Sequence, residues 1–430
     1  MSRFLISIIY IIIVGTSVFA RGGSGETTDY SFRDCEGSLT PYPEITELAG
    51  YPDSLTPVFI NHVGRHGSRF PASDAHCRSL QKVLRRATEL GTITPLGCRL
   101  NELNDEIIRR SAGKWGALDS LGEAEQSGIA GRLLQSYREL FSNQGEVIAI
   151  SSHSPRSIAS AEAFISGLGD ADSPMHFTLF SGKEYDSIVR PFDYFKSFPE
   201  YLKSNRWHPP YSGYFKHNAP SAPIRRALGK NYPFKNDAEA RDLSLIEYYV
   251  LAGCSAMSMP NPMEEFFTSE EANALWSCFN LRQYLQRSES VISSLPVEIA
   301  APLLKNIIQI NDCVTSEGYL RIKEDDKLRA ILRFGHGETI LPLVGLMRLP
   351  GCRYLTDDFA SVARNWHDFD IIPMAANVQF ILFRAKDSGN YYCRILLNES
   401  PVRLHAEDSS SIYPWSSLRE YLNSCLSIRQ

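Results

Sequence analysis

Short apolar runs alternate with amphipathic stretches along the first part of the chain. The β-prone residues 58–63 and 146–151 predict two buried strands. Residues 73–90, 117–141 and 156–168 carry apolar side chains at helical spacing. This alternation predicts an α/β fold, in which helices cover both faces of a largely parallel sheet. Ligands bind such sheets at the carboxyl ends of the strands.

The pattern changes at about residue 170. Proline and aromatic residues crowd positions 189–234, which indicates irregular structure rather than periodic elements. Three helical segments follow, over 238–252, from Thr268 onward, and around 297–310. The second opens with Thr268-Ser269-Glu270-Glu271, which is typical of a capping box. We therefore expect an α-rich cap inserted into the sheet domain.

The sheet pattern returns near the end of the chain. Residues 328–334 predict a strand, 340–347 an apolar helix, and 377–384 and 391–397 two late strands. The core is therefore expected to be discontinuous in sequence. The predicted α/β domain is discontinuous and comprises residues 49–169 and 321–430. The predicted cap insertion is mostly helical and comprises residues 170–320.

The N-terminal residues 1–20 have the pattern of a secretory signal peptide. Arg3 supplies the positive start, 4–14 the apolar region and 18–20 a small-residue cleavage site, and residues 21–48 are expected to form a leader. An uncleaved signal anchor is the alternative. No other apolar run is nearly long enough to span a membrane, so no stable membrane span is expected after cleavage. The C-terminus lacks an ER-retention tetrapeptide, which favours secretion or another lumenal destination.

Composition narrows the classes of partner. Of 430 residues, 43% are hydrophobic and 22% charged, which is ordinary for a soluble globular protein. A net charge of −5 argues against nucleic acid as a partner. Any polyanionic ligand must therefore meet a local basic pocket. The sequence leaves the oligomeric state open.

Nine cysteines lie in a chain predicted to enter an oxidising compartment, so several disulfides are expected, with at least one thiol left over. No two cysteines have C-x-x-C spacing, so no metal site is predicted. Asn398-Glu399-Ser400 is an N-glycosylation sequon and requires exposure.

The candidate chemistry begins where the first strand ends, at Arg65-His66-Gly67-Ser68-Arg69. A neutral imidazole such as that of His66 has a free lone pair and an unperturbed pKa of roughly 6.5. The planar forks of Arg65 and Arg69 match phosphate oxygens, and two fixed cations beside His66 would lower its pKa. A solvated turn with a packing histidine is the alternative.

Two further strand ends carry groups suited to phosphate. Arg156 follows Ser151-Ser152 at the start of a helix, where backbone N–H groups add to anion attraction. His336 and Glu338 lie between a strand and a helix. A carboxylic acid near anionic phosphates can have its pKa raised enough to protonate a leaving alkoxide. His405-Ala406-Glu407 has similar spacing but no such flanking elements, and we expect it on the surface.

These motifs resemble a known family. Arg65-His66-Gly67-Ser68-Arg69 is similar to the signature of the histidine phosphatase superfamily, in its branch of acid phosphatases and phytases. Ser151, Ser152, Arg156 and Ser160-Ala161-x-Ala163-Phe164 match a second family pattern. His336-Gly337-Glu338-Thr339 resembles the His-Ala-Glu-Thr of multiple inositol polyphosphate phosphatases, with Gly337 in place of Ala.

The resemblance implies a phosphoglycerate mutase-like three-layer sandwich with an inserted cap. It implies that His66 becomes a phosphohistidine, that Glu338 is the proton donor, and that no cofactor is needed. The residues expected to bind the phosphoryl group are Arg65, Arg69, Arg156 and His336. Four other histidines are expected to pack or to lie on the surface rather than bind ligand: His62, His76, His153 and His367.

The implied substrates are inositol polyphosphates, including inositol hexakisphosphate. A broad-specificity acid phosphatase or a 2,3-bisphosphoglycerate 3-phosphatase is an alternative within the same chemistry. A secreted phosphate-ligand binder without turnover is a third hypothesis, which a missing nucleophile or donor would favour; the chain has both His66 and Glu338.

Overall fold

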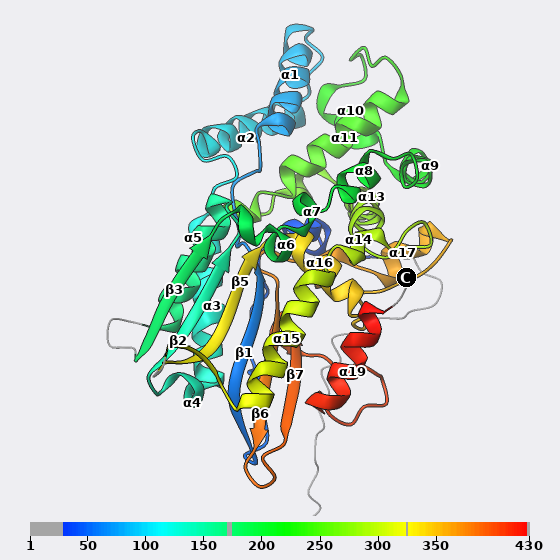
Figure 1. Ribbon diagram of the computed structural model, residues 1–430. Helices are drawn as coiled ribbons and strands as arrows, with labels where there is room; N and C mark the ends of the chain where they lie inside the picture. Colours follow the sequence, from blue (N-terminus) through cyan, green and yellow to red (C-terminus); the bar gives the residue numbers. More distant parts are fainter. Residues whose placement is uncertain (1–28, 170–173, 324–325, 428–430) are drawn as a thin grey trace, which may run out of the picture.

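The computed structural model describes residues 29–169, 174–323 and 326–427. A sheet crosses the lower part of the molecule in Figure 1, in the order β3-β2-β5-β1-β6-β7-β8, with β4 paired to β5 and β9 to β7. Neighbours among β3, β2, β5 and β1 are parallel, and β6 joins β1 antiparallel. The predicted α/β fold with a mostly parallel sheet is confirmed. The strands are β1 (Leu55–Arg65), β2 (Gly145–Ser151), β3 (Met175–Ser181), β4 (Leu320–Lys323), β5 (Asp326–Gly335), β6 (Asn377–Ala385), β7 (Tyr391–Leu397), β8 (Ser400–Pro401) and β9 (Ile412–Pro414).

Successive side chains of the central strands enter different cores, as the two-residue period of a strand requires. In β1, Phe59 and Val63 belong to one apolar cluster, whereas Ile60 belongs to the other. In β6, Phe380 and Ile381 divide in the same way. Both faces of the sheet are therefore buried, which explains why apolar residues occupy consecutive positions of these strands, as at Phe59-Ile60 and Phe380-Ile381.

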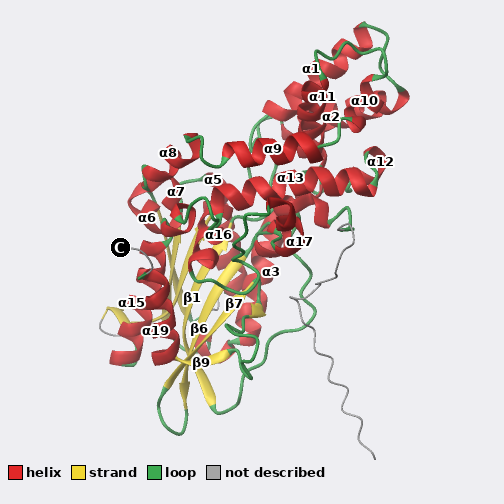
Figure 2. Ribbon diagram, turned by 90° about the vertical axis from the view of Figure 1, so that its right-hand side faces the viewer, coloured by secondary structure: helices red, strands yellow, loops and turns green. Residues whose placement is uncertain are grey.

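Helices cover the two faces and complete a three-layer arrangement (Figures 1 and 2). On one face, Ile129 of α3 and Phe164 of α5 pack in the cluster that contains Ile60. On the other, Leu304 of α15 and Leu418 of α19 pack with Phe59. The covering helices are α3 (Ser120–Ser136), α4 (Arg138–Phe141), α5 (Pro155–Leu168), α15 (Ala301–Glu317), α16 (Gly337–Leu346) and α19 (Trp415–Leu426).

A helical part lies beyond one end of the sheet, at the top of Figure 1. It has its own apolar cluster, in which Leu84 and Leu100 pack with Leu251 and Trp276. Its longer helices are α1 (Ala75–Glu89), α2 (Pro95–Ser111), α9 (His208–Asn218), α10 (Ala222–Leu228), α11 (Asp237–Leu251) and α13 (Ser269–Arg287). The shorter helices of this part and of the junction are α6 (Asp186–Val189), α7 (Pro191–Tyr194), α8 (Ser197–Lys203), α12 (Met263–Phe266), α14 (Leu295–Glu298), α17 (Val362–Asn365) and α18 (Asp368–Ile371), with 3-10 turns η1 (Asp34–Leu39), η2 (Lys183–Tyr185), η3 (Ser255–Met257) and η4 (Phe359–Ser361).

The capping box at Thr268 is confirmed, but the cap differs from the single insertion predicted for 170–320. Strand β3 lies within that range and extends the sheet, and α15 packs on the sheet rather than in the cap. Conversely, α1 and α2 precede the range and pack against α10 and α11. The proline-rich region 189–234 is helical in several short pieces rather than irregular. Long-range packing decides these boundaries, and no local pattern reports it.

The predicted leader is partly a packed element. Cys35, Glu36 and Ser38 of η1 are buried between the two parts of the protein. The predicted signal peptide, residues 1–20, lies outside the described residues. Within the described ranges, none of the helices combines the length and the apolarity that a bilayer crossing requires.

The expected disulfides are absent from the described residues. All nine cysteines are described, and all are free thiols. Seven of them are buried, where a thiol packs as a small apolar side chain. The sequon is not exposed either: Asn398 is 8% exposed and its amide donates to the backbone carbonyl of Asp370 at 2.9 Å. The condition for its glycosylation is therefore not met in the folded chain.

Candidate active site

The loop after β1 is fixed by buried hydrogen bonds. The backbone N–H of Ser68 donates to Glu125 Oε2 and the Ser68 hydroxyl to Glu125 Oε1, both at 2.7 Å. The N–H of Gly67 donates to the hydroxyl of Ser160 at 3.1 Å. Gly67 also meets α3 closely, because a Cβ at this position would lie 2.4 Å from the carbonyl oxygen of Gly122. The loop is therefore rigid before any ligand binds.

His66 is held in one orientation within this loop. Its Nδ1 lies 3.0 Å from the carbonyl oxygen of Gly67. A carbonyl oxygen only accepts, so Nδ1 carries the proton and Nε2 keeps the lone pair. Burial, then the charges of Arg65 and Arg156, hold the pKa of His66 well below its usual value. The imidazole is thus neutral and can act as a nucleophile through Nε2.

Three arginines converge on the same cavity from two strand ends. Arg65 is buried at 5% exposure, and its Nη1 donates to the carbonyl oxygens of Ser38 at 2.6 Å and of Pro373 at 3.0 Å. The Nε atoms of Arg65, Arg69 and Arg156 are buried and have no partner among the described residues. Buried N–H donors of this kind are suited to bind an anion.

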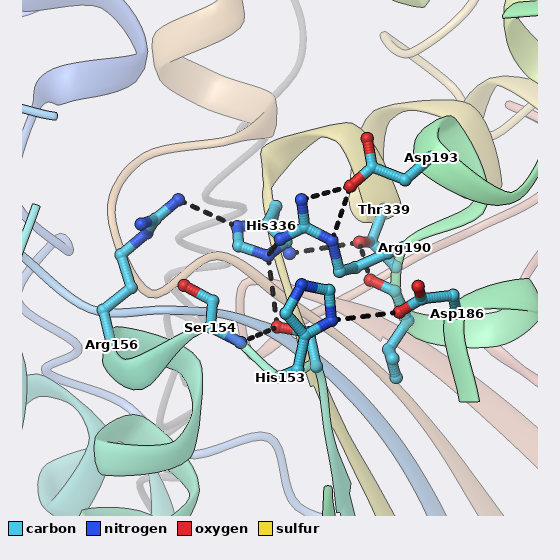
Figure 3. A network of polar contacts seen from close by, with 10 residues as sticks. His153, Ser154, Arg156, Asp186, Arg190, Asp193, His336 and Thr339 are labelled. Carbon is cyan, nitrogen blue, oxygen red and sulfur yellow. Dashed lines mark hydrogen bonds and ion pairs between the residues drawn. The ribbon is translucent and has the colours of Figure 1, made fainter. Parts of the chain in front are cut away.

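His336 comes from the neighbouring strand end, since it follows β5 and caps α16. Its Nε2 lies 2.9 Å from Arg190 Nη1, and its Nδ1 lies 3.4 Å from Arg156 Nη2 (Figure 3). The Ser152 hydroxyl lies 3.2 Å from the same Nε2. A guanidinium only donates, so the shorter contact requires Nε2 to accept, and the proton is on Nδ1. Burial, opposed by Glu338 and supported by Arg156 and Arg190, lowers the pKa of His336 to about 3. Nδ1–H and Arg156 are then two donors that face each other, and an anionic oxygen between them would accept from both.

Glu338 lies in the first turn of α16, and its carboxylate is paired with a cap arginine. Its Oε1 accepts a hydrogen bond at 2.9 Å from Nη2 of Arg287, the last residue of α13. Burial raises the pKa of Glu338, but Arg287 and then His336 outweigh burial and lower the pKa to about 2. The ion pair with Arg287 therefore keeps the carboxylate ionised, and the predicted rise in pKa applies when anionic phosphates lie beside Glu338.

These groups line one cavity of about 360 Å³ between the sheet domain and the cap. Its floor holds all six residues predicted for the site: Arg65, His66, Arg69, Arg156, His336 and Glu338. The helical part contributes further lining residues: His76, Tyr249, Phe279, Gln283 and Arg287. The cavity is strongly cationic, although the whole chain has a net charge of −5. A chain with this net charge can bind a polyanion only in such a local basic pocket.

No group of three or more His, Cys, Asp or Glu side chains among the described residues is arranged to hold a metal ion.

Residues 58–398 match the family described as "Histidine phosphatase superfamily (branch 2)". This match spans most of the chain and includes every residue of the cavity floor.

The chain belongs to the histidine phosphatase superfamily. This histidine phosphatase is 25% identical over 406 residues to multiple inositol polyphosphate phosphatase 1 of Gallus gallus, covering 90% of this chain and 86% of the relative. It is 23% identical to the Homo sapiens protein of the same name, with 90% and 84% coverage. It is therefore a phosphatase that resembles the multiple inositol polyphosphate phosphatases.

Solved structures share its fold. The multiple inositol polyphosphate phosphatase of Bifidobacterium longum, in complex with inositol hexasulfate, superposes with a TM-score of 0.72 at 16% identity and covers 92% of this chain and 98% of that one. The phytase from D. castellii gives a TM-score of 0.69 at 16% identity, with 92% and 86% coverage.

The other histidines of this histidine phosphatase pack or lie on the surface, as the sequence predicts. His62 is buried against Phe164 and Phe334, His153 lies 3.5 Å from Asp186, and His405 is exposed. His367 stacks on Phe369, and His76 packs on Tyr249 and also lines the cavity.

Sequence reasoning missed two arginines of the site. Arg190 contacts His336 across 146 residues, and a contact at this distance along the chain has no local signal. Arg287 ends a cap helix, where an arginine is also ordinary for the helix dipole. Only the packing of α13 against α16 brings it to Glu338.

Proposed function

We propose that this histidine phosphatase hydrolyses phosphomonoesters of heavily phosphorylated inositols through a covalent phosphohistidine on His66. The observation that carries the proposal is the neutral His66, with Nε2 unprotonated, among three arginines whose buried Nε donors have no partner among the described residues. The relatives named multiple inositol polyphosphate phosphatase and the inositol hexasulfate complex of a related fold support this class of substrate.

In the first step, Nε2 of His66 attacks phosphorus and the ester P–O bond breaks. Glu338, which takes up a proton from solvent when the substrate is bound, gives this proton to the leaving alkoxide, so that the alcohol departs neutral. Arg65, Arg69 and Arg156 neutralise the phosphoryl oxygens, and Nδ1–H of His336 donates to one of them. The Nδ1–H to carbonyl bond of His66 stabilises the imidazole while it carries the phosphoryl group.

In the second step, the Glu338 carboxylate takes a proton from water, whose oxygen attacks phosphorus. The P–N bond breaks, inorganic phosphate leaves, His66 is neutral again, and Glu338 returns its proton to solvent. Phosphate, substrate alcohol and one consumed water balance the reaction.

Phosphate release from inositol hexakisphosphate, 2,3-bisphosphoglycerate and a small aryl phosphate, each with a chelator present, tests the proposal. We expect the largest kcat/KM on inositol hexakisphosphate. A larger kcat/KM on bisphosphoglycerate or on the aryl phosphate would instead assign the chain to one of those activities, and no release from any of them would contradict the proposal.

A further inference from the structure

The ion pair between Arg287 and Glu338 lies in the wall of the cavity, not on the outer surface. Both residues line the cavity that contains His66, and their side chains are 22% and 33% exposed. The Nη2 to Oε1 distance is 2.9 Å. A substrate in the cavity can therefore reach either partner of this pair.

Arg287 is also connected through hydrogen bonds to Arg65, the residue before His66. Its Nη1 donates to Gln283 Oε1 at 2.5 Å, and Gln283 Nε2 donates to the Ser38 hydroxyl at 3.1 Å. The carbonyl oxygen of Ser38 accepts from Arg65 at 2.6 Å. The cap helix α13 is thus tied through hydrogen bonds to the loop that carries His66.

Glu338 faces positive charge from three surrounding elements. Arg65 and Arg69 approach from the end of β1, Arg156 from α5 and Arg287 from α13, while the neutral imidazole of His336 adjoins it at its own helix terminus. Of these, only Arg287 contacts the carboxylate in an ion pair among the described residues. A carboxylate in this pair is ionised, whereas protonation of the leaving alkoxide requires the acid. Glu338 must therefore leave Arg287, or be shielded from it, before the first step.

We propose that Arg287 binds a second phosphate of the substrate, and that its transfer from Glu338 to this phosphate allows Glu338 to take up the proton that it gives to the leaving group. This inference rests on the proposed function. The Arg287 guanidinium leaves the Glu338 carboxylate for the substrate phosphate, and solvent supplies the proton that Glu338 takes up. Glu338 recovers a proton when water attacks the phosphohistidine, and this proton returns to solvent. A substrate with a single phosphate leaves the ion pair intact, so Arg287 couples turnover to the presence of at least two phosphates.

Binding of inositol hexasulfate tests this coupling without turnover, because sulfate esters do not titrate near pH 5 and cannot be hydrolysed by a phosphatase step. Calorimetry at pH 5 in two buffers of different ionisation enthalpy measures the protons taken up. We expect uptake when inositol hexasulfate binds and much less with inorganic sulfate. Uptake should be lost in Glu338→Gln.

Arg287→Gln should weaken inositol hexasulfate binding about tenfold or more, and change the affinity for inorganic sulfate less than about twofold. Arg353→Gln is the matched control, since Arg353 forms a comparable half-buried ion pair with Glu289 at 2.7 Å outside the cavity lining. It should leave both affinities unchanged. Equal hexasulfate affinity in Arg287→Gln and the native chain, or equal proton uptake with both ligands, would overturn the proposal.

Turnover gives an independent readout. Arg287→Gln removes the charge that lowers the pKa of Glu338, so kcat/KM for a small alkyl monophosphate at pH 5 should rise, while kcat/KM for inositol hexakisphosphate falls. A merely structural role would lower both in parallel and overturn the inference. If the native chain released no phosphate, the proposed function would fail, and the binding experiment would still decide the role of Arg287.

Discussion

His66 and His336 lie beside each other, with ring centroids 5.5 Å apart, although 269 residues separate them in the chain. The reason is the register of two parallel strands: Arg65 of β1 is paired with Gly335 of β5, so the next residue of each strand enters the same edge of the sheet. Ser152, after β2, reaches the same point and contacts His336. Sheet topology, rather than any local motif, assembles the site.

Replacing Glu338 by Gln should slow turnover by about 10² to 10⁴ on inositol phosphates, because their alkoxide leaving groups need a proton. An aryl phosphate has a better leaving group, so its first step should suffer less and the phosphohistidine should accumulate. Burst kinetics with the two substrates measures both effects. Equal losses on the two substrates would remove Glu338 from leaving-group protonation.

Replacing Gly67 by Ala should destabilise the protein by about 1–3 kcal/mol and impair activity. The new Cβ would lie 2.4 Å from the carbonyl oxygen of Gly122, and neither backbone can yield without moving the loop or α3. Gly131→Ala is the control on the same helix, because nothing lies within 4 Å of its Cβ position. Urea unfolding should show Gly131→Ala to be neutral or stabilising by about 0.5–1 kcal/mol. Equal effects of the two variants would refute the close packing of the loop on α3.

Glu247 in α11 should make the stability of the protein depend on pH. It is fully buried, and neither carboxylate oxygen has a partner among the described residues. Burial, offset in part by Arg226, raises its pKa to about 8. The folded state therefore holds a proton that the unfolded chain releases above its ordinary pKa of about 4.5. Its contribution to stability is full below that pH and is lost as pH rises toward 8.

Glu247→Gln should remove this dependence. Urea midpoints at pH 5 and pH 8 should differ more for the native chain than for the variant. For a pKa shift of this size, the extra change in the free energy of unfolding is several kcal/mol. Glu264→Gln, at an exposed position of α12, is the control and should follow the native chain. Identical pH dependence in all three proteins would contradict the assignment.

The strands of the sheet and the six residues of the cavity floor could be predicted from the sequence because each carries a local signal, although only the sheet topology brings them together. Buried strands are mostly apolar runs, and groups suited to phosphate follow their carboxyl ends, as at His66 and His336. The composition of the cap could not be predicted, since α1 and α2 join it by packing against α10 and α11. The same holds for Arg287, whose role depends on where α13 ends relative to α16.

Asn398 shows that a local sequence pattern can also mislead. Its sequon is a local pattern, but the side chain supports the β6 end, where Asn398 Oδ1 accepts from the N–H of Asn377 at 3.0 Å. A left-handed backbone at φ 49° fits asparagine there better than most residues. The structure therefore explains the residue through packing rather than through a modification.

The covalent intermediate on His66 is the most direct test of the chemistry. The native protein is mixed with ³²P-labelled inositol hexakisphosphate, quenched within milliseconds under alkaline conditions, and digested, and mass spectrometry locates the label. We expect it on the peptide and imidazole of His66, and expect His66→Ala to keep its fold but neither label nor release phosphate. Label on another residue, or retained hydrolysis by His66→Ala, would contradict the phosphohistidine mechanism.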